Sequence, residues 1–205
     1  MKTIILAGGK SSRMGKNKAL LPIEGKSIIK RIAEEFTPIS EEIIIIANIP
    51  EIYNELDLSI FPDVPEFRGE GPLAGIYTGI DVADEDFCLF IACDMPFVSR
   101  KIGEYLIREL KNSGVDAVIP SHQGRVHPLF GAYHKRIQPF IKENLLNGKR
   151  KMSHLLNEVN AKIIEKQDIP EELQVEWEYC LWNLNTLEDY QKALEFYQNI
   201  NKLYR

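Results

Sequence analysis

The chain contains 205 residues, of which 44% are hydrophobic and 27% charged, a composition typical of one globular domain with a sizeable core. Its net charge of −5 disfavours general binding to nucleic acid. No segment approaches the ~18 to 20 consecutive apolar residues of a membrane span, and the N-terminal apolar run is too short for a signal peptide. We therefore expect a cytoplasmic protein whose cysteines are reduced thiols: Cys88, Cys93 and Cys180.

Short apolar runs alternate with helical patterns along the first part of the chain. The apolar runs predict strands over residues 3–7, 43–47, 58–61, 86–92 and 116–119. The run of four isoleucines from residue 43 is typical of a strand that is buried on both faces. Apolar residues at helical spacing predict helices over residues 28–36, 73–82 and about 100–110, the last with Ser99 as its N-cap.

The pattern continues less regularly toward the C-terminus. Residues 128–133 are predicted to be extended, residues 137–146 helical, and residues 162–165 and 180–184 two short strands. Thr186 begins the last predicted helix, with Asp189 completing a variant of the capping box. The inner face of that helix is predicted to consist of Leu187, Tyr190, Ala193, Leu194 and Tyr197.

This order of elements predicts an α/β fold with three layers, a mostly parallel twisted sheet with helices on both faces. No internal repeat or linker divides the chain, so we expect residues 1–205 to form a single domain. Ligands of such sheets bind beyond the carboxyl ends of the strands. Polar residues that directly follow predicted strands are therefore the candidates for a functional site.

The loop after the first predicted strand combines two adjacent glycines with several cations. Gly8 and Gly9 let the backbone turn sharply and approach a ligand closely, because no Cβ is in the way. Backbone N–H donors and positive charge together suit a triphosphate. The alternative is a solvated loop whose charge is incidental. The cations of this loop are Lys10, Arg13, Lys16 and Lys18.

This loop does not match the two best-known phosphate-binding motifs. In a P-loop the two glycines are closer by one residue than Gly9 and Gly15, and Asn17 stands where the Mg²⁺-binding hydroxyl would be. The dinucleotide pattern G-x-G-x-x-G is also absent. The loop therefore indicates phosphate binding of another kind.

Further polar residues follow the other predicted strands. Asn48 follows the isoleucine run, and an amide there can contact a base edge or simply hold a turn. Asp63 precedes a glycine-rich turn, residues 69–75, that runs into a helix N-terminus and suits a phosphate or a base, although such glycines are also common in tight entry turns.

Asp94 follows the predicted strand over residues 86–92. A carboxylate at the end of a central strand is a typical Mg²⁺ ligand, because this ion takes one or two carboxylates together with substrate phosphates. The alternative role of Asp94 is to cap a turn. Neighbouring Cys93 is interpreted as a small buried side chain rather than a nucleophile, since no partner base is apparent.

Two later motifs add candidates for a second substrate. His127 precedes Pro128 and could contact such a substrate, although a single histidine often has a structural role. Asn183 and Asn185 alternate along the last predicted strand, so they are expected to point to one side of it.

Taken together, these motifs resemble those of the molybdenum cofactor guanylyltransferases (the MobA family). The resemblance extends over almost the whole chain, in family order. The motifs at residues 71–75, 127–128 and 183–186 narrow it to the molybdopterin branch of a broader nucleotidyltransferase group. The motifs are Leu6-Ala7-Gly8-Gly9 through Arg13-Met14-Gly15 and Lys18, Gly71-Pro72-Leu73-Ala74-Gly75, Cys93-Asp94-Met95-Pro96, His127-Pro128 and Asn183-Leu184-Asn185-Thr186.

The resemblance implies a Rossmann-like nucleotidyltransferase fold and transfer of GMP from GTP to molybdopterin, with Mg²⁺ held by Asp94. It implies that Lys18, Arg13 and Asp94 are catalytic and that His127, Asn183 and Asn185 line the pterin side. One departure is Asn17, where the family often has Asp. The nucleotide-binding residues implied are Leu6, Ala7, Gly8, Gly9, Arg13, Gly15, Lys18, Asn48, Asp63, Gly71, Pro72 and Leu73.

Beyond its two substrates, we expect a monomer that makes transient contacts with other cofactor-biosynthesis proteins and binds neither nucleic acid nor membrane. Three alternatives stay open. The first is another transferase of this fold, using CTP on molybdopterin or acting on a sugar phosphate, although residues 71–75 favour guanylyl transfer. The second is a P-loop-type NTPase, disfavoured by the glycine spacing. The third is a non-catalytic nucleotide-binding module, disfavoured because a degenerate site would have lost the charges of Lys18 and Asp94.

Overall fold

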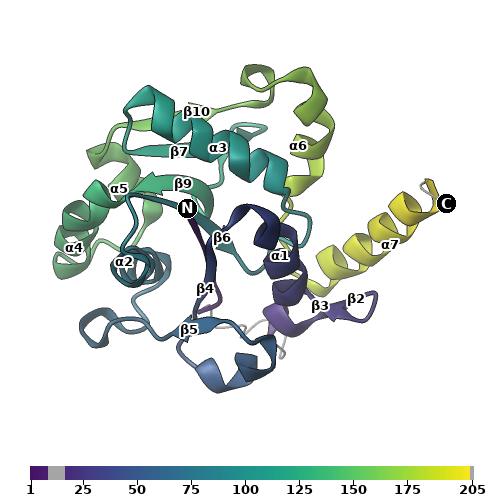
Figure 1. Cartoon of the computed structure of the whole chain (residues 1–205), viewed down its shortest axis with the longest axis horizontal. Helices are drawn as coiled ribbons and strands as arrows, with labels where there is room; N and C mark the ends of the chain where they lie inside the picture. Colours follow the sequence, from purple (N-terminus) through teal and green to yellow (C-terminus); the bar gives the residue numbers. More distant parts are fainter. Residues whose placement is uncertain (9–16, 204–205) are drawn as a thin grey trace.

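The computed structural model describes residues 1–8 and 17–203. A central sheet has the strand order β10-β7-β9-β6-β1-β4-β5 (Figure 1). Neighbouring strands run parallel except for β9, which is antiparallel to both β6 and β7. This confirms the predicted mostly parallel sheet. The strands are β1 (Lys2–Leu6), β4 (Glu42–Ile46), β5 (Ser59–Phe61), β6 (Phe87–Ala92), β7 (Ala117–His122), β9 (Phe130–His134) and β10 (Ala161–Ile164).

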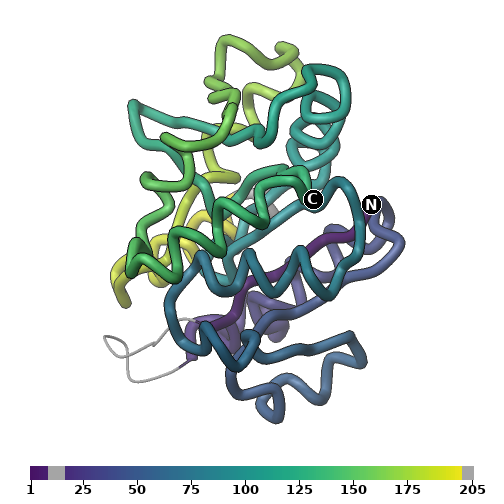
Figure 2. Tube along the Cα trace, turned by 90° about the vertical axis from the view of Figure 1, so that its left-hand side faces the viewer, coloured from purple at the N-terminus to yellow at the C-terminus, as the bar shows by residue number. Residues whose placement is uncertain are grey.

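Strand β4, which contains four isoleucines, lies beside β1 in the sheet. Ile4 of β1 is in register with Ile44 of β4 on one side and with Phe90 of β6 on the other. All three side chains are at most 1% exposed, as expected of strands covered on both faces. Figure 2 shows β1, in purple, crossing the middle of the molecule.

Helices cover both faces of this sheet and form the three predicted layers. Successive strand residues belong to opposite cores: Ile5 packs with α1 (Ile28–Phe36) and α3 (Arg100–Ser113), whereas Ile4 packs with α2 (Pro72–Ala83). Figure 1 shows α1 and α2 on opposite sides of β1, β4 and β6. The first core also includes residues of α6 (Gln174–Cys180) and α7 (Leu187–Leu203), and the second includes residues of α4 (Gln138–Leu146) and α5 (Met152–Glu158).

Two helical glycines allow these helices to lie very close to the sheet. A Cβ on Gly79 of α2 would lie 2.6 Å from a ring atom of Phe90 and 2.9 Å from a methyl of Ile4. A Cβ on Gly103 of α3 would lie 2.8 Å from the side chain of Leu89 in β6 and 2.6 Å from the ring of Phe36 in α1. Each glycine therefore fills a place on its face of the sheet where any side chain would overlap the core.

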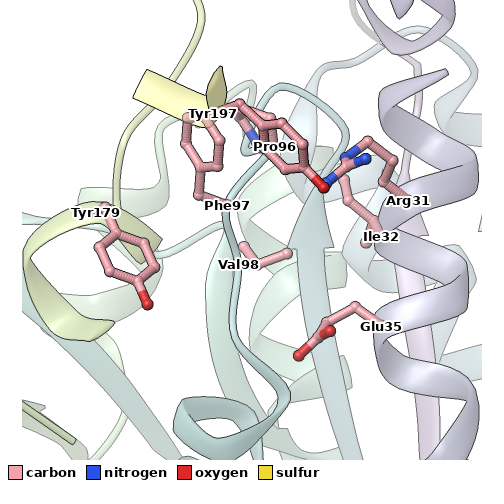
Figure 3. A pocket seen from close by; sticks show the side chains of 8 residues that line it. All are labelled: Arg31, Ile32, Glu35, Pro96, Phe97, Val98, Tyr179 and Tyr197. Carbon is pink, nitrogen blue, oxygen red and sulfur yellow. The ribbon is translucent and has the colours of Figure 1, made fainter. Parts of the chain in front are cut away.

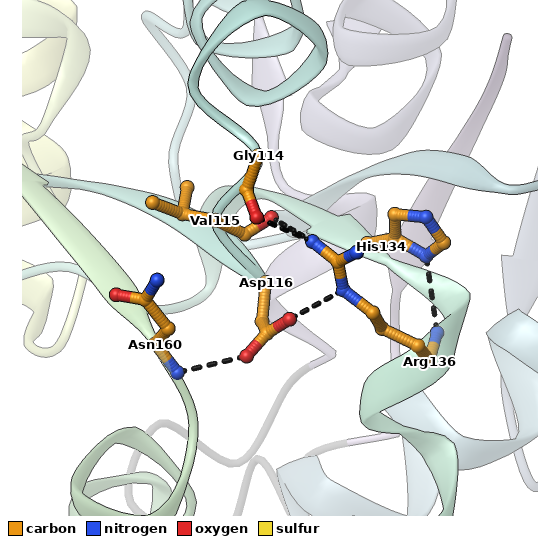
Figure 4. Close-up of polar contacts among 6 residues, drawn as sticks. All are labelled: Gly114, Val115, Asp116, His134, Arg136 and Asn160. Carbon is orange, nitrogen blue, oxygen red and sulfur yellow. Dashed lines mark hydrogen bonds and ion pairs between the residues drawn. The ribbon is translucent and has the colours of Figure 1, made fainter.

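A polar network joins the ends of β7 and β9 to the segment before β10 (Figure 4). The guanidinium of Arg136 donates to the carboxylate of Asp116 and, at 2.7 Å each, to the carbonyl oxygens of Gly114 and Val115. The other carboxylate oxygen of Asp116 accepts from the backbone N–H of Asn160 at 2.8 Å. The network fixes the relative positions of these three segments at the edge of the sheet where β7 begins.

The segment after residue 173 differs from the sequence prediction. Residues 180–184 do not form a strand: α6 ends at Cys180, and an irregular segment follows. Trp177 and Cys180 are fully buried one helical turn apart, and the backbone N–H of Leu184 donates to Asp94 rather than to a strand. The short apolar pattern of residues 180–184 is typical of a strand, but its buried residues lie at the end of a helix and in the turn that follows it.

The last helix, α7, begins as predicted but packs differently. Thr186 and Asp189 bond reciprocally, with N–H to side-chain oxygen distances of 2.8 and 3.0 Å, which confirms the variant capping box. Ala193 is buried, but Leu187 is 60% exposed, so its predicted inner position is wrong. Phe196 packs on Phe97 instead, with ring centroids 5.0 Å apart, because the helix docks through its later turns.

Other local features complete the fold. Ser99 lies at the N-cap position of α3, but its hydroxyl donates to Glu176 of α6 and makes no capping bond.

Neither α5 nor the three short strands β2 (Pro22–Ile23), β3 (Lys26–Ser27) and β8 (Arg125–Val126) were predicted. The 3-10 turns are η1 (Lys18–Leu20), η2 (Thr37–Ile39), η3 (Pro50–Leu56), η4 (Pro65–Phe67), η5 (Lys135–Ile137), η6 (Lys166–Asp168) and η7 (Glu171–Leu173). In the described part of the chain, no helix combines the length and apolarity needed to cross a membrane.

Candidate active site

The carboxyl ends of the parallel strands bring together residues that are far apart in sequence. β1, β4 and β6 end at the same edge, so Ala7, Asn48 and Asp94 follow directly from neighbouring positions. The N–H of Ala7 donates to the carbonyl of Ile46 at 2.9 Å, and the N–H of Cys93 donates to that of Leu6 at 3.1 Å. These bonds extend the ladder by one residue and fix where the loops begin.

Asp94 and Lys18 are linked through the C-terminal segment. The backbone N–H of Leu184 donates to the backbone carbonyl of Asp94 at 2.8 Å. The backbone carbonyl of Leu184 accepts from the ammonium of Lys18, also at 2.8 Å. The amide of Asn183 donates to the Asp94 carboxylate at 3.2 Å. A lysine, an aspartate and a segment about ninety residues further along the chain therefore form one cluster.

The electrostatics of this cluster centre on Asp94. Burial raises the pKa of its carboxyl group, and Lys18, Asn183 and Arg125 partly counteract this effect on the pKa. Burial also raises the pKa of the Cys93 thiol to about 12, so this side chain is protonated at neutral pH. That protonation state supports the interpretation of Cys93 as a small side chain rather than a nucleophile.

On the other side of β1, Asn48 and Asp63 form a reciprocal pair of hydrogen bonds. The Asn48 amide donates to the Asp63 carboxylate at 2.6 Å, and the Asp63 N–H donates back to the Asn48 side-chain oxygen at 3.2 Å. The same carboxylate oxygen accepts from the N–H of Gly69 at 3.1 Å, and Asp63 is only 6% exposed. Asp63 therefore fixes the loop that precedes α2, whereas half-buried Asn48 lies beside exposed Gly8.

The glycine-rich turn into α2 has the geometry that its sequence suggests. Gly71 has a φ of 85°, a conformation that L side chains rarely adopt, and Pro72 occupies the first helical position. A Cβ on Gly75 would lie 3.0 Å from Leu6, so α2 approaches the end of β1 closely. The side chain of Leu73 is fully buried in the core, which leaves only its backbone for contact with a ligand.

His127 lies at the same edge because β9 runs antiparallel and begins where its neighbours end. Burial and the positive charge of Arg125 lower the pKa of His127 to about 4, although the nearby Asn183 amide opposes the shift. The Oδ1 atom of Asn183 is buried and has no hydrogen-bond partner among the described residues. Asn183 therefore places a buried acceptor next to His127 and Asp94.

Asn185 lies apart from this group. Its residue is exposed, and its backbone N–H donates to Asp189 at the start of α7 at 2.9 Å. Because residues 180–184 form no strand, the predicted alternation that would point Asn183 and Asn185 to one side does not apply. Three other predicted residues, Gly9, Arg13 and Gly15, lie outside the described residues.

Sequence reasoning did not single out two residues that the structure brings to the site. Arg125 is exposed on β8 and acts electrostatically on both Asp94 and His127. Gln123 and Gly124, which precede Arg125, have φ values of 51° and 75° and form the turn of a β-hairpin. The Gln-Gly pair is the sequence feature that could have predicted this hairpin and so the position of Arg125. Tyr53 contacts Asn17 and Ala7, and no sequence pattern indicates this.

A pocket of about 190 Å³ is lined by residues of α1, the segment after β6, α6 and α7, and none of the predicted site residues lines it (Figure 3). Arg31 and Glu35 of α1 form one wall, and Phe97, Tyr179 and Tyr197 contribute aromatic rings. The guanidinium of Arg31 lies over the ring of Tyr197, 4.2 Å from its centroid, so the pocket is bordered by a packing contact between α1 and α7.

Comparisons with known proteins agree with this architecture. A family model described as "MobA-like NTP transferase domain" matches residues 3–163. The chain is 39% identical over 193 residues, 94% of each chain, to a protein of Carboxydothermus hydrogenoformans named "Probable molybdenum cofactor guanylyltransferase". It is 36% identical over 193 residues, 93% of this chain and 94% of the relative, to a protein of the same name from Bacillus cereus.

The fold is also that of a solved structure. The crystal structure of molybdopterin-guanine dinucleotide biosynthesis protein A from Archaeoglobus fulgidus matches with a TM-score of 0.81 and 25% identity, covering 97% of this chain and 100% of that one. The family match covers more than half of the chain, and the relatives cover nearly all of it. The chain therefore belongs to the MobA-like NTP transferase family.

Proposed function

We propose that this protein transfers GMP from GTP to molybdopterin, yielding the guanine dinucleotide form of the cofactor and pyrophosphate. The names of its relatives support this reaction. The observation that carries it is the cluster in which Leu184 joins Lys18 to Asp94 at the carboxyl edge of the sheet. A cation and a carboxylate held at a fixed separation suit a reaction in which charge develops on phosphate oxygens.

The reaction needs no general base. The terminal phosphate of molybdopterin has a second pKa of about 6, so it is largely ionised near neutral pH and can attack directly. One of its oxygens forms a bond to the α-phosphorus of GTP while the bond from that phosphorus to the β-phosphate bridging oxygen breaks, and pyrophosphate leaves. The residues of the site then act by positioning the substrates and neutralising charge, with Lys18 directed at the departing pyrophosphate.

The donor set around Asp94 fits Mg²⁺. Among the described residues no group of three or more acidic, histidine or cysteine side chains could hold a metal, but Mg²⁺ typically takes only one or two carboxylates together with water and substrate phosphates. Burial disfavours the charged form of Asp94, and a bound cation would offset that effect. When bound, the ion would supply positive charge to the phosphate oxygens.

GTP is proposed to occupy the side of the cleft formed by β1, β4 and α2. Leu6, Ala7 and Gly8 would contact guanine and ribose, largely through backbone groups. Asn48 borders the same space from β4, and the turn at Gly71 and Pro72 borders it from α2. By family resemblance, the triphosphate would be held by Gly9, Arg13, Gly15 and Lys18.

Molybdopterin is proposed to bind on the opposite side, against the C-terminal half. The unpartnered Oδ1 of Asn183 would accept an N–H from the pterin, next to His127 in its neutral form. The charge of Arg125, which acts on both Asp94 and His127, suits the terminal phosphate of the acceptor. On this proposal residues 1–205 act as one domain, in which the N-terminal part binds nucleotide and the C-terminal part binds pterin, and a monomer suffices for turnover.

The test is a nucleotide competition with product identification. Equal amounts of GTP, CTP, ATP and UTP are offered together with Mg²⁺ and molybdopterin, and the pterin products are separated and weighed by mass spectrometry. We expect the guanine dinucleotide to dominate. A cytosine dinucleotide would identify a related transferase instead, and product formation only with a sugar phosphate as acceptor would overturn the pterin assignment.

A further inference from the structure

Tyr53 lies between Ala7, at the end of β1, and Asn17, although neither the motifs nor the comparisons give Tyr53 a role. It belongs to η3 and is 1% exposed. Its hydroxyl oxygen accepts from the side-chain amide of Asn17 at 2.8 Å and lies 3.4 Å from the carbonyl oxygen of Ala7, to which it donates. A single buried phenol therefore connects the residue after β1 to the residue before Lys18.

The direction of each hydrogen bond follows from the partners. The Oδ1 atom of Asn17 accepts from the N–H of Ala19 at 3.0 Å, which leaves the NH₂ group to face Tyr53. Burial raises the pKa of Tyr53 to about 12, so the phenol keeps its proton at neutral pH. Because its oxygen accepts a hydrogen bond from the Asn17 amide, its own O–H is available to donate to Ala7.

These bonds continue into the cluster around Asp94. Asn17 caps the short turn η1 that carries Lys18, and the Lys18 ammonium contacts the carbonyl of Leu184 at 2.8 Å. A lysine side chain is long and flexible, so its reach depends on where its backbone is anchored. The backbone N–H of Ala7 donates to the carbonyl of Ile46 in β4 at 2.9 Å. The residue to which Tyr53 donates is therefore itself fixed to the sheet.

We infer that Tyr53 and Asn17 are positioning residues that fix the backbone of Lys18 relative to the end of β1, and so set the distance between Lys18 and Asp94. This inference rests on the proposed function, in which Lys18 acts on the phosphates. Neither residue touches a reacting group. Their effect should therefore pass through Lys18, and it should be largest on the rate of the chemical step.

The first test removes only the hydroxyl, with Tyr53→Phe. We expect kcat to fall about tenfold, the effect of a lost hydrogen bond that aligns a catalytic group, while KM for molybdopterin stays within about twofold. Tyr105→Phe is the matched control: Tyr105 is also buried, and its hydroxyl donates to a backbone carbonyl, that of Asp168, at 2.9 Å. The control should leave kcat unchanged. A kcat for Tyr53→Phe within about twofold of wild type would overturn the inference.

A double-mutant cycle separates positioning from a general loss of stability. If Tyr53 acts through Lys18, Tyr53→Phe should change kcat by less than about twofold in a protein that already carries Lys18→Ala. Asn17→Ser keeps an oxygen that can cap η1 but is too short to reach Tyr53. It should match Tyr53→Phe, and the two together should be no worse than either alone. Effects that multiply in these combinations would contradict the inference.

A measurement without substrate distinguishes this inference from the proposed function. Loss of the Tyr53 hydroxyl should free the Asn17 side chain and speed hydrogen exchange at the Ala19 amide by about fivefold, measured by NMR. An exchange rate unchanged by Tyr53→Phe overturns the inference whichever triphosphate the enzyme uses. If Tyr53→Phe speeds this exchange but the wild-type protein turns over another triphosphate, only the choice of GTP is refuted, and the kinetic tests would then use that triphosphate.

Discussion

The two halves of the molecule build their parts of the site in different ways. In the N-terminal half, β1, β4 and β6 are parallel and in register, so β4 and β6 deliver Asn48 and Asp94 to the edge at which β1 ends. In the C-terminal half, the residues near that edge come from an antiparallel strand and from an irregular segment after α6. The first half thus fixes positions by regular pairing, whereas the second depends on a few specific hydrogen bonds.

The difference matters at Leu184. Its backbone N–H and carbonyl serve Asp94 and Lys18, both of which belong to the N-terminal half. A substitution in the N-terminal half should therefore affect charge and catalysis, and one in the C-terminal half should affect how the second substrate is held. Substitutions in the two halves should therefore differ in which kinetic constant they change.

Asp94→Asn should cause the greatest loss. The amide keeps the size of the side chain but removes the negative charge that we assign to Mg²⁺, so kcat should fall by about 10³-fold while the thermal unfolding temperature stays close to that of wild type. Turnover is measured over a Mg²⁺ titration. Asp81→Asn, at an exposed position on α2, is the control and should behave as wild type. Turnover of Asp94→Asn that responds to Mg²⁺ as wild type does would place the metal elsewhere.

Lys18→Ala should follow, with a fall in kcat of about 10²-fold, typical of removing one charge contact to a transition state. Steady-state kinetics with saturating molybdopterin provide the measurement. Lys192→Ala removes another lysine, from an exposed ion pair with Glu188 on α7, and should change nothing. If Lys18→Ala raised only KM for GTP, Lys18 would bind the ground state and have no special role in the transfer step.

In the C-terminal half, Asn183→Ala should act on the second substrate. We expect KM for molybdopterin to rise about tenfold and KM for GTP to change by less than twofold, because we assign the Asn183 Oδ1 acceptor to the pterin. Both constants come from initial rates with one substrate varied at a time. A larger change in KM for GTP than in KM for molybdopterin would contradict the division of the site between the two halves.

His127→Gln should have the smallest effect, and it should depend on pH. The folded-state pKa of His127 is about 4, below the value of 6.5 for a free histidine, so the unfolded chain takes up a proton first as the pH falls. His127 then has no effect above about pH 6.5 and costs stability as the pH drops from 6.5 toward 4. Urea denaturation at a series of pH values should show a weaker loss for His127→Gln; an unchanged pH dependence would indicate that His127 is not held neutral.

Much of the fold could be predicted because the pattern of the N-terminal half is strong. Uninterrupted isoleucines identify a buried strand, and polar residues after parallel strands must meet at one edge. The segment 180–184 was predicted wrongly because Cys180 and Leu181 are buried by a helix end and a turn, and no local pattern separates that from a short strand. Leu187 fits the helical spacing but extends beyond the surface on which α7 docks.

The site was harder to predict than the fold, because contacts depend on tertiary structure. Asp63 follows a strand as the motif suggests, but its carboxylate is committed to Asn48 and Gly69. The bridge at Leu184 uses backbone groups, which have no signature in the sequence. Tyr53 reaches Asn17 across 36 residues of chain, so only the folded arrangement reveals the contact.

Transfer of the α-phosphate of GTP to molybdopterin is tested most directly by following the individual phosphates. Wild-type protein is incubated with Mg²⁺, molybdopterin and GTP that carries separate labels on its α- and γ-phosphates. We predict that the α-label appears in a pterin product whose mass equals molybdopterin plus GMP minus one water, and that the γ-label appears in pyrophosphate. Release of the γ-label as orthophosphate, with no α-label in any pterin product, would contradict the account.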